Sequence, residues 1–310
     1  MTVKVAQEWF AICGGCEVTI LDIGEPLLEL LPELEFVHMP VIMDHKFYGQ
    51  TGEESQMEIP EAAVGIISGS IRSEEHKEIA EEMRKKVDFL ISMGSCACYG
   101  GIPALANQFP LEEIYQRVYK GNSTTDPGET PTVGLPPLTD RVYSLGEVVK
   151  VDLQLPGCPT TPSMFVAALL HLLKGTPFAL EQKSVCDQCP TIREKKAVSE
   201  LKRPLESVEG VGEPLETVRC FMEQGFLCQG PATRAGCGGM EGGVPRCINA
   251  YMPCRGCFGP MEDNANPMVD MMGALSTVGL NPRQIPDRAA QFNRFSGAGR
   301  LRPRRTRTRR

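Results

Sequence analysis

Short runs of apolar and β-branched residues alternate with amphipathic stretches through the first half of this 310-residue chain. Each run is short enough to be one strand, and continuous apolar character is typical of strands covered on both faces. The runs are Val3–Phe10, Leu34–Met43, Ala63–Ser68, Val87–Met93 and Val148–Leu155. Because strands that alternate with helices form βαβ units, the pattern predicts an α/β fold with a parallel, doubly wound sheet.

Three amphipathic stretches predict helices. Isoleucine and leucine recur at helical spacing in Glu17–Leu31. Ser73–Lys86 opens with a serine suited to capping and two glutamates, which the positive end of the helix dipole favours. Pro162–Lys174 begins with proline and is followed by Gly175, so both of its ends carry helix-boundary residues.

The periodic pattern stops near residue 181. Segment 181–260 contains eight of the 13 cysteines, many glycines and prolines, and almost no apolar run. Such a segment has little core of its own, so we expect it to need a metal or cofactor to fold. Structural zinc is one alternative, because the CxxC pairs at 186–189 and 254–257 have zinc-ribbon spacing, whereas the longer gaps between the other cysteines do not.

Twelve cysteines fall into three sets of four along the chain. The first set is Cys13, Cys16, Cys96 and Cys158; the second is Cys186, Cys189, Cys220 and Cys228; the third is Cys237, Cys247, Cys254 and Cys257. Four thiolates are the ligands of a cubane iron–sulfur cluster or of a structural zinc ion. Three such sites in one chain indicate a relay for electrons.

The first set follows the ends of predicted strands. Cys13 and Cys16 come just after the first strand, and Cys96 and Cys158 each follow a later strand through a glycine. Carboxyl ends of parallel strands meet at the edge where open α/β sheets bind their ligands, so we expect these four thiols to converge. A thioredoxin-like dithiol is the alternative for Cys13 and Cys16 alone, but it leaves Cys96 and Cys158 without a role.

Composition and charge exclude several classes of protein. Hydrophobic residues make up 42% and charged residues 23% of the chain, as in ordinary globular proteins. The longest apolar run, Met164–Leu173, is too short to span a bilayer, and the first residues have no leader pattern, so we expect a cytoplasmic protein. The net charge of −7 argues against nucleic-acid binding, although segment 300–310 contains seven arginines and is expected to be a solvated tail.

Five segments together carry a family resemblance. In this order, AICGGCE, MGSCACYGGIPA, LPGCPTTP, CDQCP and MPCRGCFGP resemble the small subunits of cytoplasmic nickel–iron hydrogenases. The resemblance is greatest to the methyl-viologen-reducing, or coenzyme F420-non-reducing, hydrogenases of methanogens. It implies a flavodoxin-like domain over 1–180, a loop-rich domain over 181–265 and a C-terminal extension with a basic tail over 266–310.

The resemblance also implies cofactors and ligands. The chain would hold three 4Fe–4S clusters and no nickel: the first set would bind the proximal cluster, the third set the medial cluster and the second set the distal cluster. Cys186 stands where periplasmic members have histidine. Cys247 stands where they commonly have proline, which implies a complete medial cube. Gly15 and Gly101 occupy positions where oxygen-tolerant relatives have extra cysteines, which implies an oxygen-sensitive proximal cluster.

The implied function is electron transfer during hydrogen oxidation. Partners would be the large subunit, which holds the catalytic nickel–iron site, and an iron–sulfur acceptor subunit linked to a flavin-containing heterodisulfide reductase-type complex. No catalytic residue, membrane contact or nucleic-acid partner is expected in this chain. The alternatives are a subunit of an F420-reducing or energy-converting hydrogenase, and a scaffold held by zinc.

A few polar residues and one cysteine are left outside these assignments. Cys98, the spare cysteine, is expected to be a small buried residue. Glu17 is either an acid at a helix N-terminus or, by resemblance, part of a proton path. Arg72, Glu74, Glu75 and His76 are expected to form a solvated helix start without a chemical role.

Overall fold

The computed structural model describes residues 2–203, 205–240, 242–262 and 265–303. It divides into two compact units: the described parts of Met1–Pro159 and Ser296–Arg310 form unit 1, and those of Thr160–Phe295 form unit 2. Residues 304–310 of the arginine-rich tail lie outside the described residues. Within the described ranges, no helix combines the length and the apolar character that crossing a bilayer requires.

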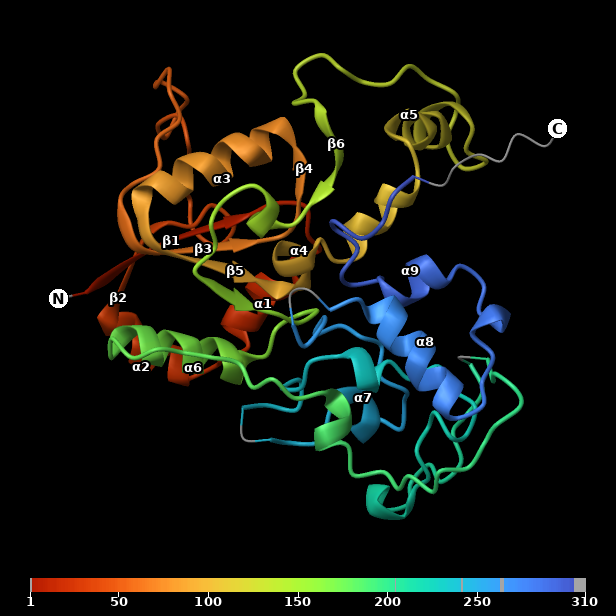
Figure 1. Cartoon of the computed structure of the whole chain (residues 1–310). Coiled ribbons are helices and arrows are strands. Elements are labelled where there is room, and N and C mark those ends of the chain that lie inside the picture. Colours follow the sequence, from red (N-terminus) through yellow and green to blue (C-terminus); the bar gives the residue numbers. More distant parts are fainter. Residues whose placement is uncertain (1, 204, 241, 263–264, 304–310) are drawn as a thin grey trace. The chain divides into compact units, whose positions relative to one another are not determined.

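Unit 1 is built on a five-stranded sheet in the order β2-β1-β3-β5-β7, in which every neighbouring pair is parallel (Figure 1). The strands are β1 (Val3–Trp9), β2 (Leu34–His38), β3 (Ala62–Ser68), β5 (Val87–Met93) and β7 (Leu153–Leu155). Counted within the sheet, this is the flavodoxin-like order 2-1-3-4-5. The predicted α/β fold with a parallel sheet is therefore confirmed.

Two predicted strands are too long. The second strand ends at His38, because Pro40 follows and cannot donate to a ladder. The last strand begins only at Leu153, since a short helical turn at Leu145–Glu147 precedes it. The valines between this turn and the strand still pack on the core, from a loop.

Helices join the strands of unit 1. They are α1 (Gly15–Leu21), α2 (Pro26–Leu30), α3 (Glu74–Lys86), α4 (Gly94–Tyr99) and α5 (Leu111–Tyr115), which a π-helical turn at Gln116–Lys120 extends. The predicted single helix at 17–31 is wrong, because Gly24 adopts a positive φ of 71° and Pro26 starts a new helix. For α3 the prediction is confirmed: the Ser73 hydroxyl accepts the His76 N–H at 3.2 Å.

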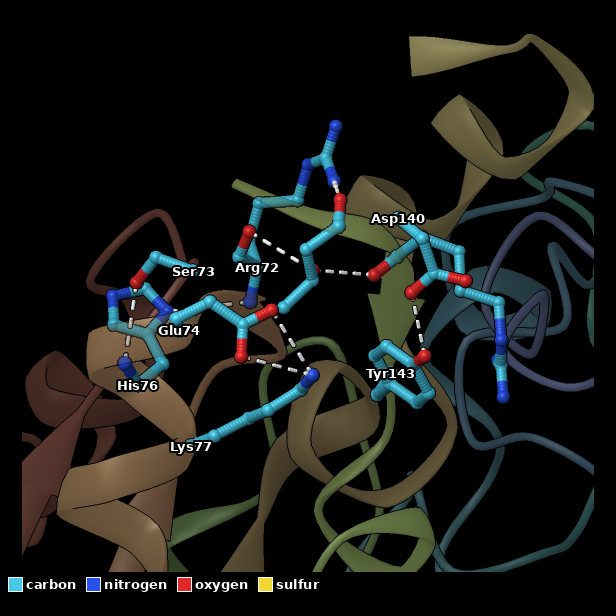
Figure 2. Close-up of polar contacts among 9 residues, drawn as sticks. Arg72, Ser73, Glu74, His76, Lys77, Asp140 and Tyr143 are labelled. Carbon is cyan, nitrogen blue, oxygen red and sulfur yellow. Dashed lines mark hydrogen bonds and ion pairs between the residues drawn. The ribbon is translucent and has the colours of Figure 1, made fainter. Parts of the chain in front are cut away.

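Helix α3 lies over the sheet and is tied to a small antiparallel ribbon. The ribbon pairs β4 (Ile71–Ser73) with β6 (Leu138–Tyr143). Figure 2 shows Arg72 of β4, with Glu74 and Lys77 of the first turn of α3, close to Asp140 and Tyr143 of β6. The Arg72 guanidinium of β4 donates to the Thr139 carbonyl at 2.7 Å, and the Lys77 ammonium of α3 lies 5.1 Å from the centre of the Tyr143 ring, so these residues fasten β4 and α3 to β6.

Unit 2 contains α6 (Pro162–Leu173), α7 (Arg246–Asn249), α8 (Pro267–Thr277) and α9 (Arg288–Phe292), joined by long irregular segments. Short 3-10 segments occur in the two units at Leu31–Glu33, Ile102–Gln108, Leu145–Glu147, Val185–Gln188, Leu215–Thr217, Gly230–Ala232 and Pro282–Gln284. The predicted start of α6 at Pro162 is confirmed, and the Thr161 hydroxyl caps the helix by accepting the Met164 N–H at 3.2 Å.

The expectation that the cysteine-rich segment has almost no apolar core is wrong. Phe221 and Phe226 are fully buried and pack with Val218 and Ile248. A second cluster brings Met271 and other residues of α8 onto segments around the second set of cysteines. The side chains of each cluster come from separate segments of the chain, so no local hydrophobic periodicity predicts that they form a core.

Asp152 offers a test of what holds β7 to the sheet. Burial acts to raise its pKa, but the Leu90 N–H at 2.9 Å and the Arg84 guanidinium at 2.5 Å together hold the pKa below its ordinary value of 3.8. Because the pKa of Asp152 is lower in the folded chain than in the unfolded chain, its ionised carboxylate stabilises the fold at pH values above the unfolded pKa. This stabilisation is lost as the pH falls through the folded pKa.

We expect Asp152→Asn to lower the free energy of opening at β5 by ~1–3 kcal/mol at neutral pH, measured by hydrogen exchange. The difference from the unmodified chain should shrink as pH falls below 3.8. Asp88→Asn is the matched control, since the Asp88 side chain is exposed. Equal losses in the two variants would contradict this role for Asp152.

Candidate cluster-binding site

The first set of cysteines gathers at the carboxyl edge of the sheet in unit 1. Cys13 lies between β1 and α1, Cys16 lies in α1, Cys96 lies in α4 after β5, and Cys158 follows β7. In the sheet order, β1 and β3 flank the point where the chain changes direction, which is where open α/β sheets bind ligands. Cys16 and Cys96 are buried, whereas Cys13 and Cys158 are exposed.

The thiols of this set influence one another. Burial raises the pKa of Cys96 to about 12, and the negative charges of Cys158 and Cys13 contribute to the rise. Burial, followed by the charge of Cys13, also raises the pKa of Cys158. Charge effects of this kind require short separations, so three loops that are distant in sequence bring their sulfurs together.

Reciprocal hydrogen bonds hold two of these loops in place. The Ser95 N–H donates to the Gly157 carbonyl at 2.7 Å, and the Gly157 N–H donates to the Ser95 hydroxyl at 3.1 Å. Each bond joins the neighbour of one cysteine to the neighbour of another. The positions of Cys96 and Cys158 are therefore fixed with respect to each other.

Two glycines leave space around the sulfurs. Gly94 has a φ of 82°, and a Cβ there would overlap the Cys16 sulfur. Gly101 has a φ of 53°, and its Cβ would lie 2.5 Å from the Cys96 sulfur. Both backbone conformations strongly favour glycine. Four soft sulfur donors in a cradle without side chains suit an iron–sulfur cluster.

Three of the four cysteines of the second set line a cavity of about 520 Å³ in unit 2. Cys186, Cys220 and Cys228 line it, together with Arg193 and Lys195. Burial raises the pKa of Cys186 to about 12; Arg193 opposes this rise, while Cys189 and Cys220 add to it. The Ser184 hydroxyl and N–H both donate to Asp187, at 2.8 and 2.7 Å, which shapes the turn between Cys186 and Cys189.

The third set comes together as two pairs. Burial raises the pKa of Cys237, and the charge of Cys247 adds to it. Burial also raises the pKa of Cys254 well above its ordinary value, with further contributions from Cys228 and Cys257. The Cys254 N–H donates to the Cys228 sulfur at 3.3 Å, so a member of the third set contacts a member of the second.

Cys98 lies apart from all three sets. Its sulfur is 3.3 Å from the Ser92 hydroxyl and donates to the Ser92 carbonyl at 3.4 Å, inside the unit 1 core. The placement agrees with the expected role of a small buried residue. Within the described residues, no three His, Cys, Asp or Glu side chains are arranged to hold a single metal ion.

A polar network lies beside the first set, and Glu17 is the one member of it that the sequence singled out. Glu17 is 4% exposed; it accepts from the Gln7 amide at 3.2 Å and from the Ser68 hydroxyl. Glu8 and His38 pair nearby at 2.5 Å and are equally buried. Glu17 is thus a buried acid in the first turn of α1. The available signal was the Gln7–Glu8 pair inside an otherwise apolar strand.

Arg193 was also missed, although it lines the cavity of the second set. The charge of Cys186 is the main cause that raises its pKa, with Cys220 and Cys189 adding to it against the opposing effect of burial. Arg193 follows Cys189 by four positions, which matches no known motif, so the spacing does not predict that Arg193 lies beside the thiols.

Comparison with known proteins places this geometry in a family. Residues 13–172 match the family described as "NADH ubiquinone oxidoreductase, 20 Kd subunit". The chain is 39% identical to a subunit of the F420-non-reducing hydrogenase (vhu) of Methanocaldococcus jannaschii, over 96% of this chain and 95% of that relative.

Two solved structures are similar. The structure of an NAD+-reducing nickel–iron hydrogenase in the H2-reduced state has a TM-score of 0.53 and 29% identity, over 58% of this chain and 96% of that chain. The Ni-Fe-Se hydrogenase of Desulfomicrobium baculatum has a TM-score of 0.51 over 90% of this chain and 99% of that chain; at 17% identity it supports the fold alone. Because the match to the M. jannaschii protein spans nearly all of both chains, this chain belongs to the family of small, electron-transfer subunits of F420-non-reducing nickel–iron hydrogenases.

Proposed function

We propose that this subunit carries electrons from hydrogen oxidation through three 4Fe–4S clusters to a cytoplasmic acceptor. The first set of cysteines would bind the proximal cluster, the third set the medial cluster and the second set the distal cluster. When bound, each cluster supplies a one-electron carrier. The observation that carries this proposal is the gathering of the first set at the carboxyl edge of the sheet, where Gly94 and Gly101 leave room beside the sulfurs.

The exposed side of the first set supports an interface with the large subunit. Cys13 and Cys158 are exposed, and so are apolar side chains near the same edge. Trp9 ends β1 with 43% of its surface exposed, and Val18 and Leu21 of α1 are more than half exposed. Such side chains mark surfaces that bind another protein. The large subunit would bury the proximal cluster and shorten the path from the nickel–iron site.

The ligand types support a low-potential relay. All twelve proposed ligands are cysteines, including Cys186 and Cys247, and each thiolate adds negative charge that lowers the reduction potential of its cluster. A low potential suits a flavin-containing heterodisulfide reductase-type complex, reached through an iron–sulfur acceptor subunit. We propose that complex as the electron acceptor.

The proposal is tested by the metal content of the complex with the large subunit, purified without oxygen. We expect about 12 iron atoms and as many sulfides for each copy of this chain, beyond the nickel–iron site. Viologen dye should be reduced when hydrogen is added. Stoichiometric zinc in place of iron would contradict the proposal and favour the zinc scaffold.

Cys247 allows a test of the medial site. It is the second residue of α7, where proline is tolerated because the first helical N–H groups have no partner within the helix. We therefore expect Cys247→Pro to fold but to leave one iron of the medial cluster without a protein ligand. After oxidation the iron count should fall by about one, and a three-iron signal should appear in electron paramagnetic resonance (EPR).

Cys98→Ala is the matched control for this variant, because it also removes one cysteine. Its iron content and spectrum should equal those of the unmodified complex. If Cys247→Pro also kept all of its iron after oxidation, Cys247 would not be a cluster ligand.

Gly101 tests the cradle of the proximal site. Its φ of 53° and ψ of −152° are almost confined to glycine, and a Cβ would be 2.5 Å from the Cys96 sulfur. We expect Gly101→Ala to cost ~1–3 kcal/mol of backbone strain and to reduce proximal cluster content several-fold, measured by iron analysis and EPR. Gly146→Ala, where no atom lies within 4 Å of the added Cβ, should keep the full iron content. Normal cluster content in both variants would refute the cradle.

A further inference from the structure

Thr191 brings a hydroxyl group to a cysteine of the second set. Its Oγ1 lies 3.1 Å from the Cys189 sulfur, within hydrogen-bond reach, and both residues are partly buried. A cysteine that binds a cluster is a thiolate and carries no proton. With the ligand in that state, only the hydroxyl can donate, so the bond runs from Thr191 to the sulfur.

The backbone immediately after Thr191 is held by two hydrogen bonds. The Ile192 N–H donates to the Val218 carbonyl at 2.8 Å, and the Ile192 carbonyl accepts the Cys220 N–H at 2.7 Å. These bonds join the segment that carries Cys189 to the segment that carries Cys220. The main chain that carries the Thr191 hydroxyl is therefore held beside the set.

The next residues of the segment are fixed as well. The Glu223 carboxylate, on a residue only 3% exposed, accepts the Glu194 N–H at 2.7 Å and the Lys195 N–H at 2.9 Å. Lys195 adopts a positive φ of 58°, which is uncommon for a side chain of this kind. The turn presents Arg193 and Lys195 to the same cavity as Cys186 and Cys220.

We propose that Thr191 is a positioning residue that raises the reduction potential of the distal cluster by donating a hydrogen bond to Cys189. The inference rests on the proposed function. In the step concerned, the distal cluster gains one electron from its neighbour in the relay, and no proton moves. The added charge is shared by the cysteine sulfurs, so a donor stabilises the reduced cluster more than the oxidised one.

The test is Thr191→Val in the complete complex with the large subunit, with each cluster titrated by EPR at controlled potential. Valine keeps the shape of threonine and removes the hydroxyl. We expect the ratio of reduced to oxidised distal cluster, at a fixed potential, to fall about tenfold, which corresponds to ~59 mV for one electron. The proximal and medial clusters should titrate as in the unmodified complex, and Thr191→Ser should restore the distal potential.

Thr277→Val is the matched control. Thr277 lines the same cavity, but its hydroxyl donates to the Ala274 carbonyl at 2.7 Å. This variant should leave the distal potential unchanged. If Thr191→Val fails to assemble, Thr191→Ala provides the same measurement with a smaller side chain.

Two results would overturn the inference and are distinguishable. A Thr191→Val complex with full iron content and an unchanged distal potential would show that the hydroxyl does not act on the cluster, and the proposed function would stand. An unmodified complex without a distal cluster would remove the proposed function and the inference together.

Discussion

The structure depends on bringing cysteine sulfurs from distant parts of the chain into small volumes without side chains between them. At the first set, glycine backbone lies directly against the sulfurs, in conformations that residues with a side chain rarely adopt. Gly94 and Gly101 adopt positive φ angles against the sulfurs, and Ser95 and Gly157 bond to each other across two loops. The parallel sheet supplies the common edge, and the glycines allow the close approach.

Charge is arranged differently in the two units. Beside the first set, the buried groups are Glu17, Glu8 and His38, which hydrogen-bond among themselves and with strand residues. Beside the second set, Arg193 and Lys195 line the cavity together with the thiols. A thiolate cluster next to positive charge is easier to reduce than one in an apolar setting. Under the proposed assignment of clusters, this difference favours electron flow from the first set toward the second.

The sequence predicted the sheet and its ligand-binding edge, because strand-length apolar runs and the cysteines after them are local signals. It failed where a single backbone angle decides the outcome, as at Gly24, which divides one amphipathic stretch into two helices. It also failed where contacts are long-range: Phe221 and Ile248 meet in a core that no periodic run announces. The division of the cysteines into three sets comes from their order along the chain and from the family resemblance. The assignment of each set to a cluster stays a prediction. The roles argued for Thr191 and Arg193 rest on spatial contacts, with the Cys189 sulfur and with the cavity of the second set, which sequence spacing does not reveal.

The hydrogen bond from the Cys254 N–H to the Cys228 sulfur has a consequence for how unit 2 is assembled. The Gln229 N–H donates back to the Cys254 carbonyl at 2.9 Å, so the two loops share a pair of bonds, and each loop carries a cysteine of a different set. If the loop of Cys228 closed around a cluster at the second set, it would also position Cys254 as a ligand for the third set, and the reverse would hold for the loop of Cys254. We therefore expect the two sites to fill cooperatively, so that a chain that has lost one cluster is also poorly prepared to keep the second.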